Sequence, residues 1–191
     1  MYDTVENFAY MADANPSTHA TLTEERVYEL VEHKTTWSPW PGDSWTEGTG
    51  PNGGEDFNQV SSGGVDGDDD YAGMIGVFSP ADGALISRTY DLSSADAFVL
   101  SVYIPDGRSS PSEYVRVYFK DRFGIWTEVF TIDDCDPPDE NGWRYKSLTV
   151  TDFTYRHSYF QVKYVAAIDQ GSEIGIDSQR IEQANTARME Q

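Results

Sequence analysis

Two stretches of the sequence decide the fold class: EYVRVYFK at residues 113–120 and YFQVKYVAAI at residues 159–168. In the first stretch Val115, Val117 and Phe119 alternate with polar or amphipathic side chains, and the second stretch has the same alternation. Successive side chains of a strand point to opposite faces of its sheet, so a period of two predicts strands with one buried and one exposed face. Antiparallel sheets commonly have this arrangement.

Six further runs of strand-forming residues, separated by turn residues, surround these two stretches. They are MIGVF, ALISRTY, AFVLSVYI, GIWTEVFTI, WRYKSLTV and EIGIDSQRI. No helical period intervenes between them, and strands of this number and spacing suit two packed sheets. The sequence therefore predicts an all-β chain with an antiparallel β-sandwich of jelly-roll topology over residues 37–182, followed by a tail at residues 183–191.

Residues 1–36 have a different pattern, which predicts a short helical extension. TVENFAYMADA spaces apolar residues at helical intervals, and TLTEERVYELVEHK at residues 21–34 begins with a Thr-x-x-Glu capping box. Helices this short need a packing partner, which is either the sandwich itself or a neighbouring chain in an assembly. The candidate assembly residues are Val5, Phe8, Val27, Leu30 and Val31.

Charge is the strongest signal in the composition. The 33 acidic residues outnumber the 13 basic ones, and the net charge is −20. Such a chain repels DNA and anionic membranes, so we expect no nucleic-acid partner, and no apolar run is long enough to predict membrane insertion. A lysine-poor acidic surface is typical of proteins from halophilic organisms, and an ordinary acidic protein is the alternative.

The order of ALISRTYDLSSADAFVLSVYI, YVRVYFKDRFGIWTEVF, GWRYKSLTV and YFQVKYVAAIDQGSEIGIDSQRI resembles MAM-like and related carbohydrate-binding jelly-roll sandwiches, over roughly residues 74–181. The similar features are a DLS turn before a core strand, a tryptophan-bearing strand after the central hairpin and a closing I-x-I-D-x-x-x-I strand. The chain lacks the cysteines of animal MAM domains. The resemblance implies a non-enzymatic adhesion, recognition or assembly module. It also implies a structural calcium ligand at Asp177, for which a solvent-facing strand position is the alternative.

The acidic stretch SSGGVDGDDDYAG at residues 61–73 imitates the start of a helix-flanked calcium loop. Counted from Asp66 as the first position of such a loop, the sixth position holds Tyr71 instead of the required glycine, and the twelfth holds Val77 instead of the required glutamate. We therefore expect a solvated loop in which Asp68 and Asp70 bind calcium only weakly unless a distant group such as Asp177 completes the site. The many carboxylates and three histidines show no catalytic spacing, so no catalytic residue is assigned.

Aromatic residues give the best candidates for a binding site. On the exposed positions of the 113–120 strand and near the following one we expect a contact surface made of Tyr114, Arg116, Tyr118 and Trp126. The tryptophans of WSPWPGDSW at residues 37–45 could stack on sugars as well, but the prolines and glycines around them favour a packed loop.

These observations leave more than one function open. Adhesion modules act outside cells, and the chain begins without a recognisable secretory leader. A virus particle accounts for action outside cells without a secretory leader, because its components assemble in the host cytoplasm and leave by lysis. The first interpretation is thus a virion surface component, such as a capsid decoration, turret or tail-associated protein of a virus with a halophilic host, which contacts other virion subunits or itself. The alternatives are an extracellular module that binds a host-surface glycan, with or without calcium, and a secreted hydrolase with a degenerate domain.

Overall fold

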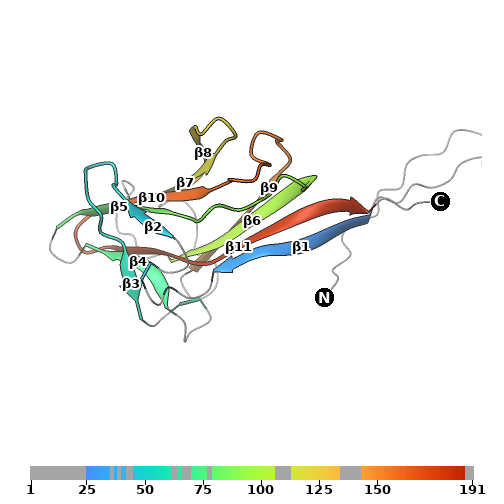
Figure 1. The fold of residues 1–191 in the computed structure, drawn as a ribbon. Coiled ribbons are helices and arrows are strands. Elements are labelled where there is room, and N and C mark those ends of the chain that lie inside the picture. The colour runs from blue at the N-terminus through green and yellow to red at the C-terminus, as the bar shows by residue number, and fades with distance from the viewer. Residues whose placement is uncertain are drawn as a thin grey trace, which may run out of the picture.

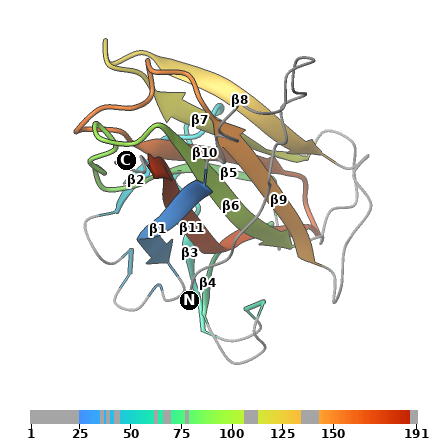
Figure 2. The same cartoon turned by 90° about the vertical axis from the view of Figure 1, so that its right-hand side faces the viewer.

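The computed structural model of the chain describes residues 25–34, 37, 40–41, 45–61, 64–65, 70–76, 79–105, 113–133 and 143–187. These residues form two antiparallel sheets that pack against each other, as Figures 1 and 2 show. The all-β sandwich expected from the alternating pattern is therefore confirmed. Within the same residues no helix is long and apolar enough to cross a membrane.

The two sheets divide the eleven described strands between them. The six-stranded sheet contains, in spatial order, β3 (Asn58–Val60), β4 (Tyr71–Ile75), β11 (Glu173–Ala187), β6 (Ala97–Pro105) and β9 (Trp143–Val150), with β1 (Glu25–Lys34) also paired to β11. The five-stranded sheet contains β2 (Thr46–Gly48), β5 (Ala81–Ile86), β10 (Val162–Ile168), β7 (Tyr114–Lys120) and β8 (Trp126–Asp133). The long β11 is the centre of the first sheet, because it pairs with β1, β4 and β6.

The core lies between the sheets and follows the predicted alternation. On β7 the side chains of Val115, Val117 and Phe119 are fully buried, and the intervening ones are partly exposed. Phe98 on β6 contacts Phe119 and Phe160 with ring centroids 5.8 and 4.9 Å apart, which joins the two sheets through aromatic packing. Burial of such side chains supplies most of the energy that holds the layers together.

The helix predicted over residues 21–34 is wrong for residues 25–34, which form β1. This strand pairs with β11 from Glu25↔Ala187 to Lys34↔Gln179, and the register shifts by one residue between Leu30 and Glu32. A β-bulge of this kind breaks the period of two, so the apolar spacing of β1 imitated a helix. Backbone pairing to a long neighbouring strand overrides the local helical pattern.

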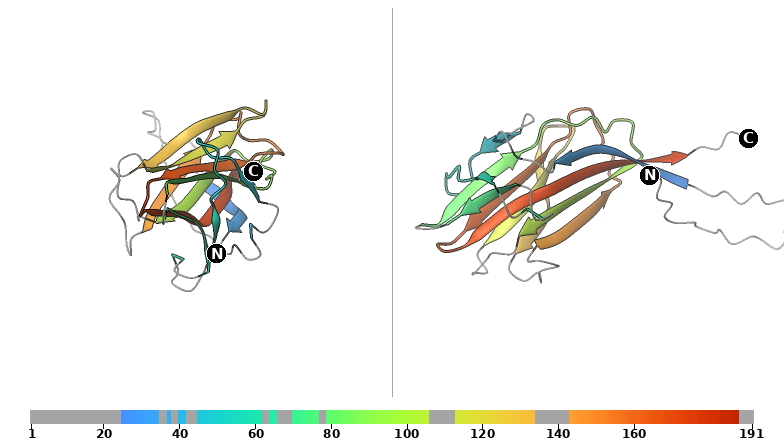
Figure 3. Two further views of the ribbon diagram at one scale, coloured as in Figure 1. Left: turned by 90° about the vertical axis from the view of Figure 1, so that its left-hand side faces the viewer. Right: turned by 90° about the horizontal axis from the view of Figure 1, so that it is seen from below.

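The candidate assembly residues are placed by this strand. Val27 and Leu30 are exposed, with exposed fractions of 40% and 52%, whereas Val31 packs against the core. Val5 and Phe8, with the first predicted helix, lie outside the described residues. Figure 3 shows that the paired ends of β1 and β11 project past the other strands of their sheet. Strand β11 continues through residue 187, past the boundary expected at residue 182.

The three tryptophans Trp37, Trp40 and Trp45 pack into the core, in agreement with the packed position that the prolines and glycines around them favoured. Trp37 and Trp45 are buried, and their ring centroids are 5.1 Å apart. Trp45 stacks on Tyr164 of β10, with a centroid distance of 6.2 Å and an interplanar angle of 13°. Trp40 is partly buried against the same cluster. These rings close one part of the core.

Candidate functional site

The outer face of the five-stranded sheet carries a cluster of aromatic and basic side chains, which we call the aromatic face. It arises from the alternation of β7, because burial of the valines turns every second side chain outward. Strand pairing then brings β10 and β8 alongside, with Lys163 opposite Tyr118 and Trp126 opposite Lys120. The aromatic face consists of Tyr114, Arg116, Tyr118, Lys120, Trp126 and Lys163.

Cation–π contacts hold the rings of this face. The Arg116 guanidinium lies 4.1 Å from the centroid of the Tyr114 ring. The Lys163 ammonium lies 4.7 Å from the Tyr118 centroid and 4.8 Å from that of Trp126. Each contact of this type contributes about 0.5–1 kcal/mol at a partly exposed site. These contacts therefore favour the observed arrangement of the rings modestly.

Polar groups complete the face at its β8 side. The Tyr118 hydroxyl donates a hydrogen bond of 3.2 Å to Glu128, which also accepts one of 2.6 Å from the Thr131 hydroxyl. The Arg116 Nε atom lies 4.0 Å from the same carboxylate. Burial lowers the pKa of Lys163 below its ordinary value, which is the expected effect of removing an ammonium group from water.

A pocket of about 500 Å³ continues the aromatic face at its Tyr114 end. Strand pairing sets Ala167 of β10 between Tyr114 of β7 and Asp82 of β5, and these three residues form one wall of the pocket. Pro51 and Asn52, from the connection between β2 and β3, also line the pocket, and the other lining residues are Pro80, Ala81, Ile168 and Asp169. The site therefore includes both a flat aromatic part and a concave end.

The connection that carries Pro51 and Asn52 is held by Asp82 at the start of β5. The Asp82 carboxylate accepts hydrogen bonds from the backbone N–H groups of Asn52, at 2.6 Å, and Gly54, at 3.0 Å. Gly53 has a φ of 99°, which favours glycine. A side chain at Gly50 would collide with the Asp82 carboxylate and the Gly83 backbone, so the glycines of this turn allow its close approach to β5.

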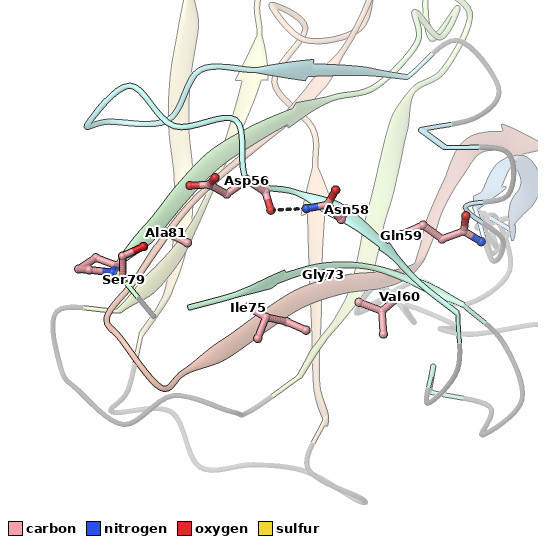
Figure 4. Close-up of a pocket in the computed structure, with 9 residues that line it drawn as sticks. Asp56, Asn58, Gln59, Val60, Gly73, Ile75, Ser79 and Ala81 are labelled. Atoms are coloured by element: carbon pink, nitrogen blue, oxygen red, sulfur yellow. Dashed lines mark hydrogen bonds between the residues drawn. The ribbon is translucent and has the colours of Figure 1, made fainter. Parts of the chain in front are cut away.

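A second pocket, of about 340 Å³, lies between β3, β4 and the start of β5. Figure 4 shows its polar side chains spread along the pocket, with the Asn58 amide donating a 3.0 Å hydrogen bond to the Asp56 carbonyl. The described lining residues are Asp56, Asn58, Gln59, Val60, Gly73, Ile75, Ser79, Pro80 and Ala81. This lining includes neither an aromatic ring nor a basic group, so the aromatic face is the better candidate site.

The residues considered for calcium have other roles in the described structure. Asp70 accepts hydrogen bonds from the backbone of Trp37, at 3.1 Å, and from the Gln59 amide. Asp177 is buried, and it accepts backbone hydrogen bonds from Val65, at 2.9 Å, and from its neighbour in sequence. The solvent-facing alternative for Asp177 is therefore wrong, because this carboxylate ties a loop to β11.

Asp68, the third residue considered for calcium, lies outside the described residues. Across the part of the chain that is described, no group of three or more histidine, cysteine, aspartate or glutamate residues could hold a metal ion. Calcium binding by Asp68, Asp70 and Asp177 thus stays a prediction.

The sequence analysis named four members of the aromatic face as a contact surface, and it named neither Lys120 and Lys163 of this face nor Asp82 of the adjoining pocket; that the named residues bind a ligand stays a prediction. Tyr114, Arg116 and Tyr118 share one face of β7, and Trp126 joins them from β8. Lys163 occupies a polar position of the alternating stretch at residues 159–168, so that pattern could have placed it on an exposed face. Which strand would lie beside it could not be obtained from the pattern.

No protein-family model matches the sequence, and no curated protein sequence is significantly similar to it. Solved structures nevertheless share its fold. A family 61 carbohydrate-binding module in complex with β-1,4-galactotriose has a TM-score of 0.51 at 10% identity, over 78% of this chain and 90% of that one. A family 22 xylan-binding domain from Paenibacillus barcinonensis has a TM-score of 0.51 at 12% identity, over 84% and 97%.

A third similar structure is the K3 cleaved adhesin domain of Lys-gingipain from Porphyromonas gingivalis, with a TM-score of 0.52 at 12% identity, over 80% of this chain and 99% of that one. The chain therefore shares the β-sandwich fold of carbohydrate-binding modules and of an adhesin domain. At these identities the likeness concerns the fold alone.

Proposed function

We propose that this chain is a non-enzymatic glycan-binding module, and that the aromatic face with its adjoining pocket holds the glycan. The observation that carries the proposal is the arrangement of Tyr114, Tyr118 and Trp126 on one exposed sheet face that ends in a pocket. Sugar rings present apolar C–H surfaces and polar edges, and aromatic side chains with nearby hydrogen-bonding groups match both.

The dimensions of the site suit a chain of sugars. Tyr114 and Tyr118 are four residues apart on β7, which corresponds to about 13 Å along a strand. The pocket of about 500 Å³ beyond Tyr114 lies within the usual range of ligand sites. The glycan therefore lies along β7, with one end directed toward Asn52.

The shared fold supports binding as the task of this chain. Two of the similar structures are described as a galactotriose complex and a xylan-binding domain, and both match most of this chain. These likenesses favour glycan binding over a place on a virion surface, for which neither the structure nor the comparisons give support. A virion location, other virion subunits as partners and self-association stay predictions, and so does an extracellular location.

Affinity electrophoresis through gels that contain single soluble polysaccharides tests the proposal. We expect at least one polysaccharide to retard the protein, and Trp126→Ala to weaken binding about tenfold, which corresponds to 1.4 kcal/mol. Tyr145→Ala is the matched control, because Tyr145 is an exposed aromatic residue on β9 of the other sheet. Binding that survives Trp126→Ala unchanged, or that Tyr145→Ala weakens equally, would contradict this placement of the site.

A further inference from the structure

We infer that the aromatic face is built for an acidic glycan, whose sugar units carry carboxylates, and that Arg116, Lys120 and Lys163 bind those anionic groups. This inference rests on the glycan-binding function proposed above and specifies its ligand class. It follows from three features of the face: its local charge, the Lys163 ammonium, with which no carboxylate of the described residues pairs, and the positions of the cations over the rings.

The local charge of the face is opposite in sign to that of the whole chain. The chain has 13 basic residues against 33 acidic ones, yet three of the 13 gather on the aromatic face. Among the described residues, Glu128 is the carboxylate that an ion pair or hydrogen bond links to this cluster, while Asp82 and Asp169 line the adjoining pocket, so the positive charge is confined to the aromatic face itself. A positive patch on a strongly acidic protein is a departure from its composition, and it favours an anionic ligand.

Lys163 is the strongest single indication of an anionic ligand. Its ammonium group lies between the Tyr118 and Trp126 rings, and within the described part of the chain no carboxylate pairs with it. Burial lowers its pKa, and no neighbouring acid opposes that effect. A partly desolvated cation without a charged partner gains free energy when an anion arrives, because the new pair compensates for lost hydration.

The positions of the cations also argue against a neutral sugar. Arg116 lies 4.1 Å from the centre of the Tyr114 ring, so its guanidinium occupies a ring face on which a sugar would otherwise stack. A neutral sugar would have to displace this group without offering it a new partner. A carboxylate-bearing sugar can instead pair with the guanidinium in a bidentate manner while its ring contacts the neighbouring aromatic surface.

The net charge of −20 does not prevent such binding. At physiological ionic strength the Debye length is about 8 Å, so exposed acidic groups farther away are largely screened. Lys120 and Lys163 both contact the same Trp126 ring, within 5.7 and 4.8 Å of its centroid, so their two charges act on one small area. A carboxylate at this place senses those cations more strongly than the distant acids.

Matched polysaccharides test the inference directly. The probes are polygalacturonate, polymannuronate and polyglucuronate, each beside its methyl ester, which keeps the sugar backbone and removes the charge. We expect the protein at about 0.15 M salt to bind at least one acid form tenfold or more tightly than its ester. Polyglutamate is the control for a charged polymer without sugar rings, and we expect it to bind far more weakly.

Single substitutions then assign the effect to the cations. Arg116→Gln and Lys163→Gln should each weaken binding of the preferred acid form by about fivefold to tenfold and leave binding of its ester unchanged. Arg180→Gln is the matched control: Arg180 lies on β11 of the other sheet, its side chain is 44% exposed against 42% for Arg116, and it too pairs with one glutamate. It should leave both affinities unchanged.

The outcomes separate this inference from the function on which it rests. Equal binding of acid and ester forms, or preference for neutral galactan or xylan, would overturn the acidic-glycan inference and leave glycan binding standing. Equal binding of polyglutamate would overturn it too, since the face would then recognise charge without the sugar. If no polysaccharide, acidic or neutral, binds at all, the proposed function itself is refuted.

Discussion

Asp82 holds the β2–β3 connection against β5 through hydrogen bonds, so we expect its substitution to change both the stability of the fold and the proposed glycan binding. The buried carboxylate accepts two backbone hydrogen bonds, from Asn52 and Gly54, and the Asp82 backbone N–H donates a 3.0 Å bond to Asp56. A hydrogen bond to a charged group contributes about 1.5–3 kcal/mol. Because the connection is partly exposed, water replaces some of this loss.

We therefore expect Asp82→Asn, which keeps one acceptor oxygen, to lower the free energy of unfolding by about 1–2 kcal/mol, and Asp82→Ala by about 2–4 kcal/mol. Urea unfolding measures both values. Since the connection walls the pocket beside Tyr114, Asp82→Ala should also weaken glycan binding at a temperature where the protein stays folded. Asp152→Ala is the control, because Asp152 holds an exposed turn through Thr154, away from this pocket.

Equal unfolding free energies for wild type and Asp82→Ala would show that the hydrogen bonds from Asn52 and Gly54 to the Asp82 carboxylate do not stabilise the fold. Loss of stability without any change in glycan affinity would show that the pocket wall does not contact the ligand. In that case the aromatic part of the site would have to account for all of the binding.

Three further predictions concern the folded chain as a whole. Tyr164→Phe should cost about 1–3 kcal/mol in urea unfolding, because it removes a 2.7 Å hydrogen bond to the buried Gln179 side-chain oxygen, and a cost below about 0.5 kcal/mol would count against this bond. Burial raises the pKa of Tyr90 to about 12, so this residue's contribution to stability should be complete below pH 10 and fall by about 1.4 kcal/mol per pH unit between pH 10 and 12, where only the unfolded chain ionises. Urea titrations at pH 9 and 11 should show this loss, and Tyr90→Phe should reduce it. The net charge of −20 predicts that the melting temperature rises from low to molar salt, and equal melting temperatures would contradict the self-repulsion on which a halophilic origin was inferred.

The fold could be predicted from the sequence where burial leaves a local pattern. Val115, Val117 and Phe119 point to the core because they alternate along one strand, and that alternation needs no knowledge of the neighbouring strands. The pattern failed in β1, where the register shift between Leu30 and Glu32 changes the spacing of apolar residues. A bulge depends on the partner strand, so its position is not encoded in a local period.

For the candidate site, the sequence pattern could group residues along a single strand, but it could not show which strands pair. Alternation grouped Tyr114, Arg116 and Tyr118, but the contact of Lys163 with Tyr118 depends on the pairing of β10 with β7, which are far apart in the sequence. Asp177 shows the same limit: the sequence left a calcium ligand and a solvent-facing position open, and in the structure the residue is buried next to the register shift of β11 against β6. Pairing between distant strands is a property of the whole fold, and it decides which side chains form a site.

The net charge of the chain and the local charge of the aromatic face have opposite signs. Net charge sums every ionisable group, and the total of −20 predicted that anionic partners such as DNA and acidic membranes are repelled. A ligand on the aromatic face instead senses the groups within about one Debye length, where Arg116, Lys120 and Lys163 are gathered over three aromatic rings. Each cation is held there by a ring, so the acidic surface elsewhere can keep the protein soluble without neutralising the face. The fold thus separates a basic, aromatic surface on β7, β8 and β10 from an acidic remainder, and a ligand that carries both carboxylates and sugar rings fits the first.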